Sequence, residues 1–120
     1  MAPSNAVPVP VNTDIKTIHT ELIAIAAGLD EAVGRAKTVD EVNGLLEQLA
    51  DVNHRVTALG RKLFAQQTAG IHQAATKVME ATEQTKKDVA ELDKISDILA
   101  NVTKFLGLVD KLLAVAGPLL

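Results

Sequence analysis

The stretch AQQTAG, residues 65–70, decides the fold of this chain. It interrupts an apolar pattern that runs from Val42 to Leu63 and resumes from Ile71 to Leu92. If the stretch is a loop, the chain has four helices of similar length, which predicts an up-and-down four-helix bundle. If it is helical, it is a four-residue insertion in the seven-residue heptad pattern, known as a stutter. The apolar stripe then continues without a break along one long helix.

We expect the second arrangement, a continuous helix from about residue 39 to residue 91. The stretch contains no proline, and Gly70 costs a helix only about 1 kcal/mol relative to alanine. Such a helix is roughly 80 Å long. Thr82 and Thr85 fall on its apolar stripe, where a four-helix core is expected to place larger apolar groups. The four-helix bundle remains the alternative.

The composition favours helices throughout. Apolar residues make up 48% of the 120 residues, yet there is no Trp or Tyr and there are only two Phe. Sheet proteins usually carry more aromatic and turn residues, whereas a chain rich in Ala and Leu favours helix. We therefore assign the chain to the all-α class, as an antiparallel helical hairpin or bundle with coiled-coil-like heptad seams.

Proline and capping residues divide the chain into an arm and one helical domain. Residues 1–12 hold three of the four prolines, which favour extended backbone, so we expect a flexible N-terminal arm there. The remaining residues, 13–120, form the expected helical domain. Its expected helices span about 14–36, 39–64 (continuing to 91 in the long-helix arrangement) and 95–116.

Local signals predict where the helices begin and end. Thr13 is a suitable N-cap for the first helix, and Thr38 begins a T-x-x-E capping box ahead of the second. The connection between these two helices is short, so we expect them to lie antiparallel. The last helix is expected to begin near Asp93 or Ser96 and to end at the Gly-Pro pair, residues 117–118.

The last helix carries an apolar face that is wider than a two-helix seam needs. On a helical wheel its apolar residues fill an arc of roughly 140°, and Leu108 and Val115 fall beside the charged side. We therefore expect neighbours to cover this helix from at least two directions. The predicted interaction surface consists of Val102, Phe105, Leu106, Leu108, Val109, Leu112, Leu113 and Val115.

The sequence lacks the patterns that catalytic and cofactor sites need. It has no cysteine, no glycine-rich phosphate loop and no nucleophile elbow. The three histidines do not form the i, i+4 pair of a helical metal site. His54 shares a face with Asp40, Glu47 and Arg61 at intervals of seven, which predicts a solvated helix face. We expect no enzymatic activity, no cofactor and no metal.

The charge and the apolar stripes predict the kind of partner. A net charge of −3 and the absence of Trp and Tyr disfavour nucleic acid. We expect a non-enzymatic protein that associates through apolar helix faces, as a homo-oligomer or with a protein partner. The alternative is a protein that acts at a lipid surface through the amphipathic segment 95–120. No signal peptide or membrane span is evident, so the default location is cytoplasmic.

Overall fold

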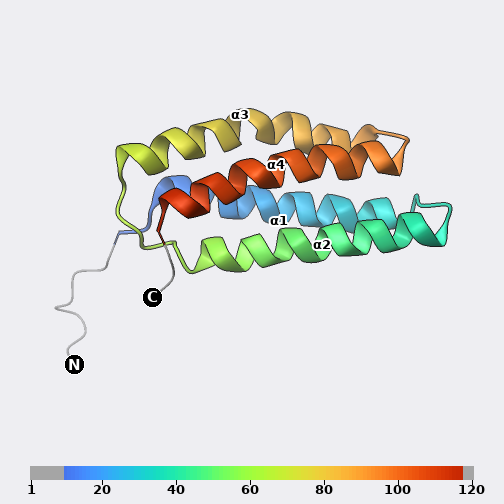
Figure 1. Cartoon of the computed structure of the whole chain (residues 1–120), viewed down its shortest axis with the longest axis horizontal. Coiled ribbons are helices and arrows are strands. Elements are labelled where there is room, and N and C mark those ends of the chain that lie inside the picture. The colour runs from blue at the N-terminus through green and yellow to red at the C-terminus, as the bar shows by residue number, and fades with distance from the viewer. Residues whose placement is uncertain (1–9, 118–120) are drawn as a thin grey trace, which may run out of the picture.

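The computed structural model describes residues 10–117, which form an all-α, up-and-down four-helix bundle (Figure 1). The helices are α1 (Thr13–Val33), α2 (Val39–Gly60), α3 (Ala69–Glu91) and α4 (Ile95–Val115). The expected long helix from 39 to 91 is wrong, because the chain leaves helical structure after Gly60 and returns to it at Ala69. Residues 1–9 of the expected arm lie outside the described residues.

Thr68 explains why a new helix begins at Ala69. Its backbone is extended, with φ −114° and ψ 160°, and its hydroxyl accepts a hydrogen bond from the Ile71 N–H at 3.1 Å. Thr68 is therefore the N-cap of α3, where it satisfies one of the free N–H groups of the first turn. This local signal outweighs the absence of a proline in the AQQTAG stretch.

Thr82 and Thr85 lie in the core, contrary to the expectation that a four-helix core excludes them. They are only 3% and 5% exposed. Each hydroxyl donates a 2.9 Å hydrogen bond to the carbonyl four residues earlier, that of Val78 or Ala81. Because the hydroxyl is satisfied within its own helix, it needs no partner across the core.

The four helices form two antiparallel hairpins that pack against each other, α1 with α2 and α3 with α4 (Figure 1). Between the hairpins, α1 lies against α3 and α2 lies against α4. Since each connection reverses the chain, these two pairs run parallel. The consecutive helices α2 and α3 are therefore diagonal neighbours, and residues 61–68 cross the end of the bundle between them.

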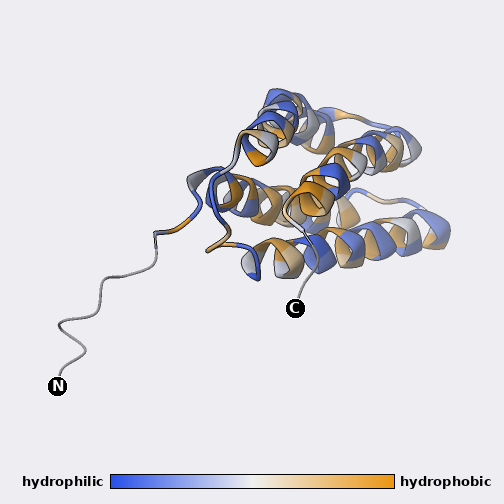
Figure 2. Ribbon diagram, turned by 60° about the vertical axis from the view of Figure 1, so that its left-hand side comes forward, coloured by the Kyte–Doolittle hydropathy of each residue, from blue (hydrophilic) through white to orange (hydrophobic). Residues whose placement is uncertain are grey.

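The apolar stripes expected from the sequence form the core, and Figure 2 shows the apolar faces turned mostly toward the inside of the bundle. Helix α4 lies against both α2 and α3, which confirms that its wide apolar face has more than one neighbour. Its seven buried residues are Ile95, Ile98, Val102, Phe105, Leu106, Val109 and Leu112. The hydrophobicity of this helix is therefore used mainly within the chain.

The first hairpin closes with the expected capping residue. The Thr38 hydroxyl accepts from the Glu41 N–H at 3.1 Å, as in a capping box. The Glu41 carboxylate accepts from the Lys37 N–H at 2.7 Å, one residue before the N-cap. The first helix ends at Val33 and not near residue 36, with Gly34 at its C-cap.

The ends of the other helices differ in part from the expected ones. Asn12, not Thr13, is the N-cap of α1. Lys94 holds the N-cap position of α4 without a side-chain hydrogen bond, so neither Asp93 nor Ser96 caps this helix. At the other end of α4, Gly117 has a φ of 92°, the left-handed conformation that glycine adopts most readily, and this ends the helix as expected.

Candidate functional site

Five of the eight residues in the predicted interaction surface lie in the core of the bundle. They are at most 3% exposed and are Val102, Phe105, Leu106, Val109 and Leu112. In the folded bundle this chain already covers them. Leu113 and Leu108 are half-buried, and Val115 is 50% exposed. Of the predicted surface, these last three residues are the ones that remain accessible in the folded bundle.

Leu108 and Val115 line an open groove between α3 and α4, which we call the α3–α4 groove. Its volume is about 800 Å³. Two other hollows are smaller, at about 370 Å³ between the two hairpin connections and about 240 Å³ between α1 and α3. The α3–α4 groove is lined by Gly70, His72, Gln73, Ala74, Thr76, Lys77 and Glu80 of α3 and by Leu108, Lys111, Ala114 and Val115 of α4.

Small residues bring the two helices close together along the groove. Because α3 and α4 are antiparallel, the first turn of α3 lies beside the last turn of α4. A Cβ atom on Gly70 would lie 3.2 Å from Cγ1 of Val115, so glycine permits this close approach. The α3 wall from Gly70 to Glu80 is roughly 15 Å long at 1.5 Å per residue, which corresponds to about three turns of helix.

The groove is more basic than the chain as a whole. It has Lys77 on the α3 wall, Lys111 on the α4 wall and one carboxylate, Glu80, whereas the full chain has a net charge of −3. Within residues 10–117 the ion pairs involve other cations, so neither groove lysine has an acidic partner there. In this part of the chain, the groove therefore presents two ammonium groups on opposite walls and one carboxylate, Glu80, which leaves it with a net positive charge.

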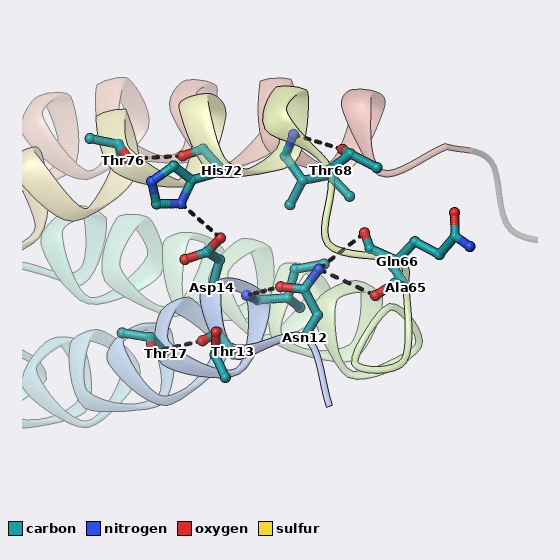
Figure 3. Close-up of polar contacts among 11 residues, drawn as sticks. Asn12, Thr13, Asp14, Thr17, Ala65, Gln66, Thr68, His72 and Thr76 are labelled. Atoms are coloured by element: carbon teal, nitrogen blue, oxygen red, sulfur yellow. Dashed lines mark hydrogen bonds and ion pairs between the residues drawn. The ribbon is translucent and has the colours of Figure 1, made fainter. Parts of the chain in front are cut away.

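His72 ties the groove to α1. Its Nδ1 lies 3.1 Å from Oδ2 of Asp14, whose side chain is only 16% exposed (Figure 3). The contact joins the first turn of α3 to the first turn of α1. This places His72 in a structural pair and leaves the two lysines as the cationic groups that face an incoming ligand.

Asn12 fixes the segment that leads into the groove. It is fully buried, and its backbone N–H donates to the Leu63 carbonyl at 2.7 Å. Its Nδ2 donates to the carbonyls of Ala65 and Gln66, each at 3.3 Å, while its Oδ1 accepts from the Ile15 N–H at 3.1 Å (Figure 3). Asn12 belonged to the expected flexible arm, yet here it joins the start of α1 to the crossing between α2 and α3.

Charged contacts hold α1 to α3 and α2 to α4. Lys86 lies 2.9 Å from Glu21, and the hydrogen bond to Glu21 raises the pKa of Lys86. Arg55 makes two 2.9 Å hydrogen bonds to Asp110, and these raise the pKa of Arg55. In this way α3 and α4, which form the walls of the groove, are each joined to the other hairpin.

An additional contact closes the far end of the bundle. The Arg35 guanidinium, between α1 and α2, donates a 2.6 Å hydrogen bond to the Val89 carbonyl in the last turn of α3. A cationic donor at this position complements the negative end of the helix dipole. Together with the contact between His72 and Asp14 near the opposite end, it joins α3 to the first hairpin at both ends.

The histidines lie apart from one another in the bundle. His54 is exposed together with Asp40, Glu47 and Arg61, which confirms the predicted solvated face of α2. His19 is half-buried beside Gly60. Between residues 10 and 117 no three His, Asp or Glu side chains lie where they could hold a metal ion.

Sequence reasoning found the α4 side of the groove but missed the α3 side. The signal for Leu108 and Val115 was their position beside the charged face of the last helix. Ala74 and Lys77 gave no such signal, because their role depends on how α3 packs against α4. No helix within the described part of the chain is long and apolar enough to cross a bilayer.

Comparisons of the chain with protein-family models, with curated proteins and with solved structures find no match. The functional proposal is therefore based on the geometry of the α3–α4 groove.

Proposed function

We propose that this chain is a non-enzymatic interaction protein that holds an amphipathic helix of a second protein in the α3–α4 groove. The observation that supports the proposal is an apolar lining that residues 10–117 leave uncovered, formed by Leu108 and Val115 with the flanking Ala74 and Ala114. Burial of apolar surface is favourable by about 25 cal/mol per Å². A partner that covers this lining gains that free energy.

The shape of the groove suits a helix. An amphipathic helix that binds in a groove inserts its apolar face between two helices of the receptor. The roughly 15 Å wall accommodates about three turns, and the small side chains of Ala74 and Ala114 leave room for close approach of a backbone. The partner is either a second copy of this chain or another protein.

The other exposed apolar side chains give weaker support for a docking surface. Ile23, Val39, Leu46 and Phe64 are 48–74% exposed, but none of them lines the groove. Isolated exposed apolar residues are common on soluble proteins. Ile23, at 49% exposed, is therefore a matched control for Val115, at 50%.

The lipid-surface alternative requires a change of fold. An interfacial helix presents its apolar face to the lipid, but seven residues of the α4 face are buried in the bundle. The bundle must open before segment 95–120 can act in this way. Binding of a helix in the groove needs no such opening, which favours a protein partner.

Site-specific labelling tests the proposal, because the chain has no cysteine of its own. An environment-sensitive dye is attached to Q73C in the groove or to N53C on α2. Designed amphipathic helical peptides are then titrated in, and self-association is followed by sedimentation velocity from micromolar to millimolar protein.

We expect a saturable response at Q73C, none at N53C, and at least a tenfold loss of affinity in V115D but not in I23D. If the partner is a second copy of this chain, V115D should also lose self-association, whereas I23D should keep it. The proposal is wrong if Q73C does not respond to any peptide and the protein remains monomeric throughout.

A further inference from the structure

We infer that the α3–α4 groove selects an acidic amphipathic helix, with carboxylates on both sides of its apolar face. This inference rests on the proposed function and adds the chemistry of the partner. Lys77 and Lys111 occupy opposite walls, with Ala74 and Leu108 also lining the space. A helix whose apolar side chains contact this lining would bring flanking Glu or Asp residues toward both lysines.

The distribution of ion pairs supports this assignment. Two cations at the contacts between the hairpins have acidic partners, since Lys86 pairs with Glu21 and Arg55 pairs with Asp110. The two groove lysines have no such partner within residues 10–117. The groove is thus a locally basic surface on a chain whose net charge is −3, and complementary charge is a common source of partner selectivity.

A peptide helix fits the groove better than an anionic lipid surface does. Ala74 and Ala114 give the groove small side chains that admit a helix, whereas a membrane-binding surface needs large apolar groups that project outward. Among the described residues that line the groove, Val115 is the one strongly exposed large apolar side chain. Two lysines also provide limited attraction to anionic lipid.

Three designed peptides of equal length test the inference. They share one apolar face and carry Glu, Gln or Lys at the flanking positions. Each is titrated against wild type, K77E/K111E and the control K16E/K87E, which changes the net charge equally at exposed lysines outside the groove. K77Q/K111Q provides a neutral variant, and circular dichroism verifies that each variant is folded.

We expect wild type to bind the acidic peptide about tenfold more tightly than the basic one at low salt, since two exposed ion pairs each contribute up to about fivefold. The preference should shrink as salt rises. It should disappear in K77Q/K111Q, reverse in K77E/K111E and persist in K16E/K87E.

The possible failures are distinct. Equal affinity of wild type for all three peptides, with the loss in V115D retained, overturns the acidic-helix inference and leaves the proposed function standing. No binding of any peptide, with a monomeric protein, overturns both. Binding to phosphatidylglycerol vesicles that V115D abolishes, in the absence of peptide binding, assigns the groove to lipid and also overturns both.

Discussion

The substitution N12D tests how far the crossing between α2 and α3 depends on one buried side chain. Aspartate has the same shape as asparagine and is an equally good N-cap, so the bond from the Ile15 N–H is kept. What changes is the Nδ2 group, which donates to the carbonyls of Ala65 and Gln66 at 3.3 Å. In N12D an oxygen replaces that donor and faces two carbonyl oxygens.

The cost follows from burial. Asn12 is 0% exposed, so the new carboxylate lies away from water and against the two carbonyl oxygens. The Ile15 N–H offsets only part of this buried charge, so the cost is up to about 3–5 kcal/mol, a large part of the roughly 5–15 kcal/mol that stabilises a domain. N12S keeps a capping oxygen and loses only the two long hydrogen bonds, so its expected cost is about 1–2 kcal/mol.

The pH dependence separates the two variants. In folded N12D, burial among carbonyl oxygens raises the pKa of the introduced carboxyl group above its unfolded value of about 3.9. Below the unfolded pKa both states are protonated, and the carboxyl group can donate to one carbonyl. The destabilisation of N12D then grows as pH rises through the unfolded pKa and becomes constant above the folded pKa. N12S has no such group, so its cost relative to wild type is expected to stay constant with pH.

Urea unfolding followed by circular dichroism at 222 nm, between about pH 4 and pH 8, measures these differences by linear extrapolation. The result that refutes the reasoning is an N12D protein that lies within about 0.5 kcal/mol of wild type at neutral pH, the range typical of unconstrained surface substitutions. A large but pH-independent loss would refute the buried-carboxylate explanation alone.

Further substitutions test the packing of the helices. G107A should raise the free energy of unfolding by about 1 kcal/mol, because a Cβ there meets nothing within 4 Å and alanine favours helix. G28A should lose stability despite the same gain in helix propensity, because its Cβ would lie 2.9 Å from Cγ1 of the buried Val89. Urea unfolding of both proteins should therefore give changes in the free energy of unfolding that have opposite signs. T82V should gain up to about 1 kcal/mol, because its hydroxyl bonds only to the Val78 carbonyl of the same helix and removal leaves no buried group unpaired; a loss in thermal unfolding would contradict this.

Local sequence signals were sufficient for the first hairpin. The stripe of α1 from Ile15 to Leu29 is buried as expected, and Thr38 caps α2. These features depend on residues within about one turn of each other or on the helical period. The N-cap of α1 was displaced by one residue, because both Asn12 and Thr13 suit an N-cap and only contacts with Leu63 and Ala65 distinguish them.

The break between α2 and α3 was harder to predict because its evidence is divided between local and distant residues. Thr68 is a local cap signal within AQQTAG, but the buried partner of the loop is Asn12, more than fifty residues away. The argument from Thr82 and Thr85 failed for a different reason. It required larger apolar groups at these positions of a four-helix core, whereas threonine is accommodated there with its hydroxyl bonded four residues back in the same helix.

The apolar character of α4 has two separate origins, and the structure distinguishes them by position. Residues that face α2 and α3 together, such as Phe105 and Leu112, are buried and explain why the stripe is wide. Leu108 and Val115 lie at the edge of that buried face and line the α3–α4 groove. Folding alone accounts for the first set, because burial within the chain stabilises it. Val115 remains half exposed between small neighbours and two lysines that lack an acidic partner in the described bundle. The association that we propose would bury this residue together with Leu108.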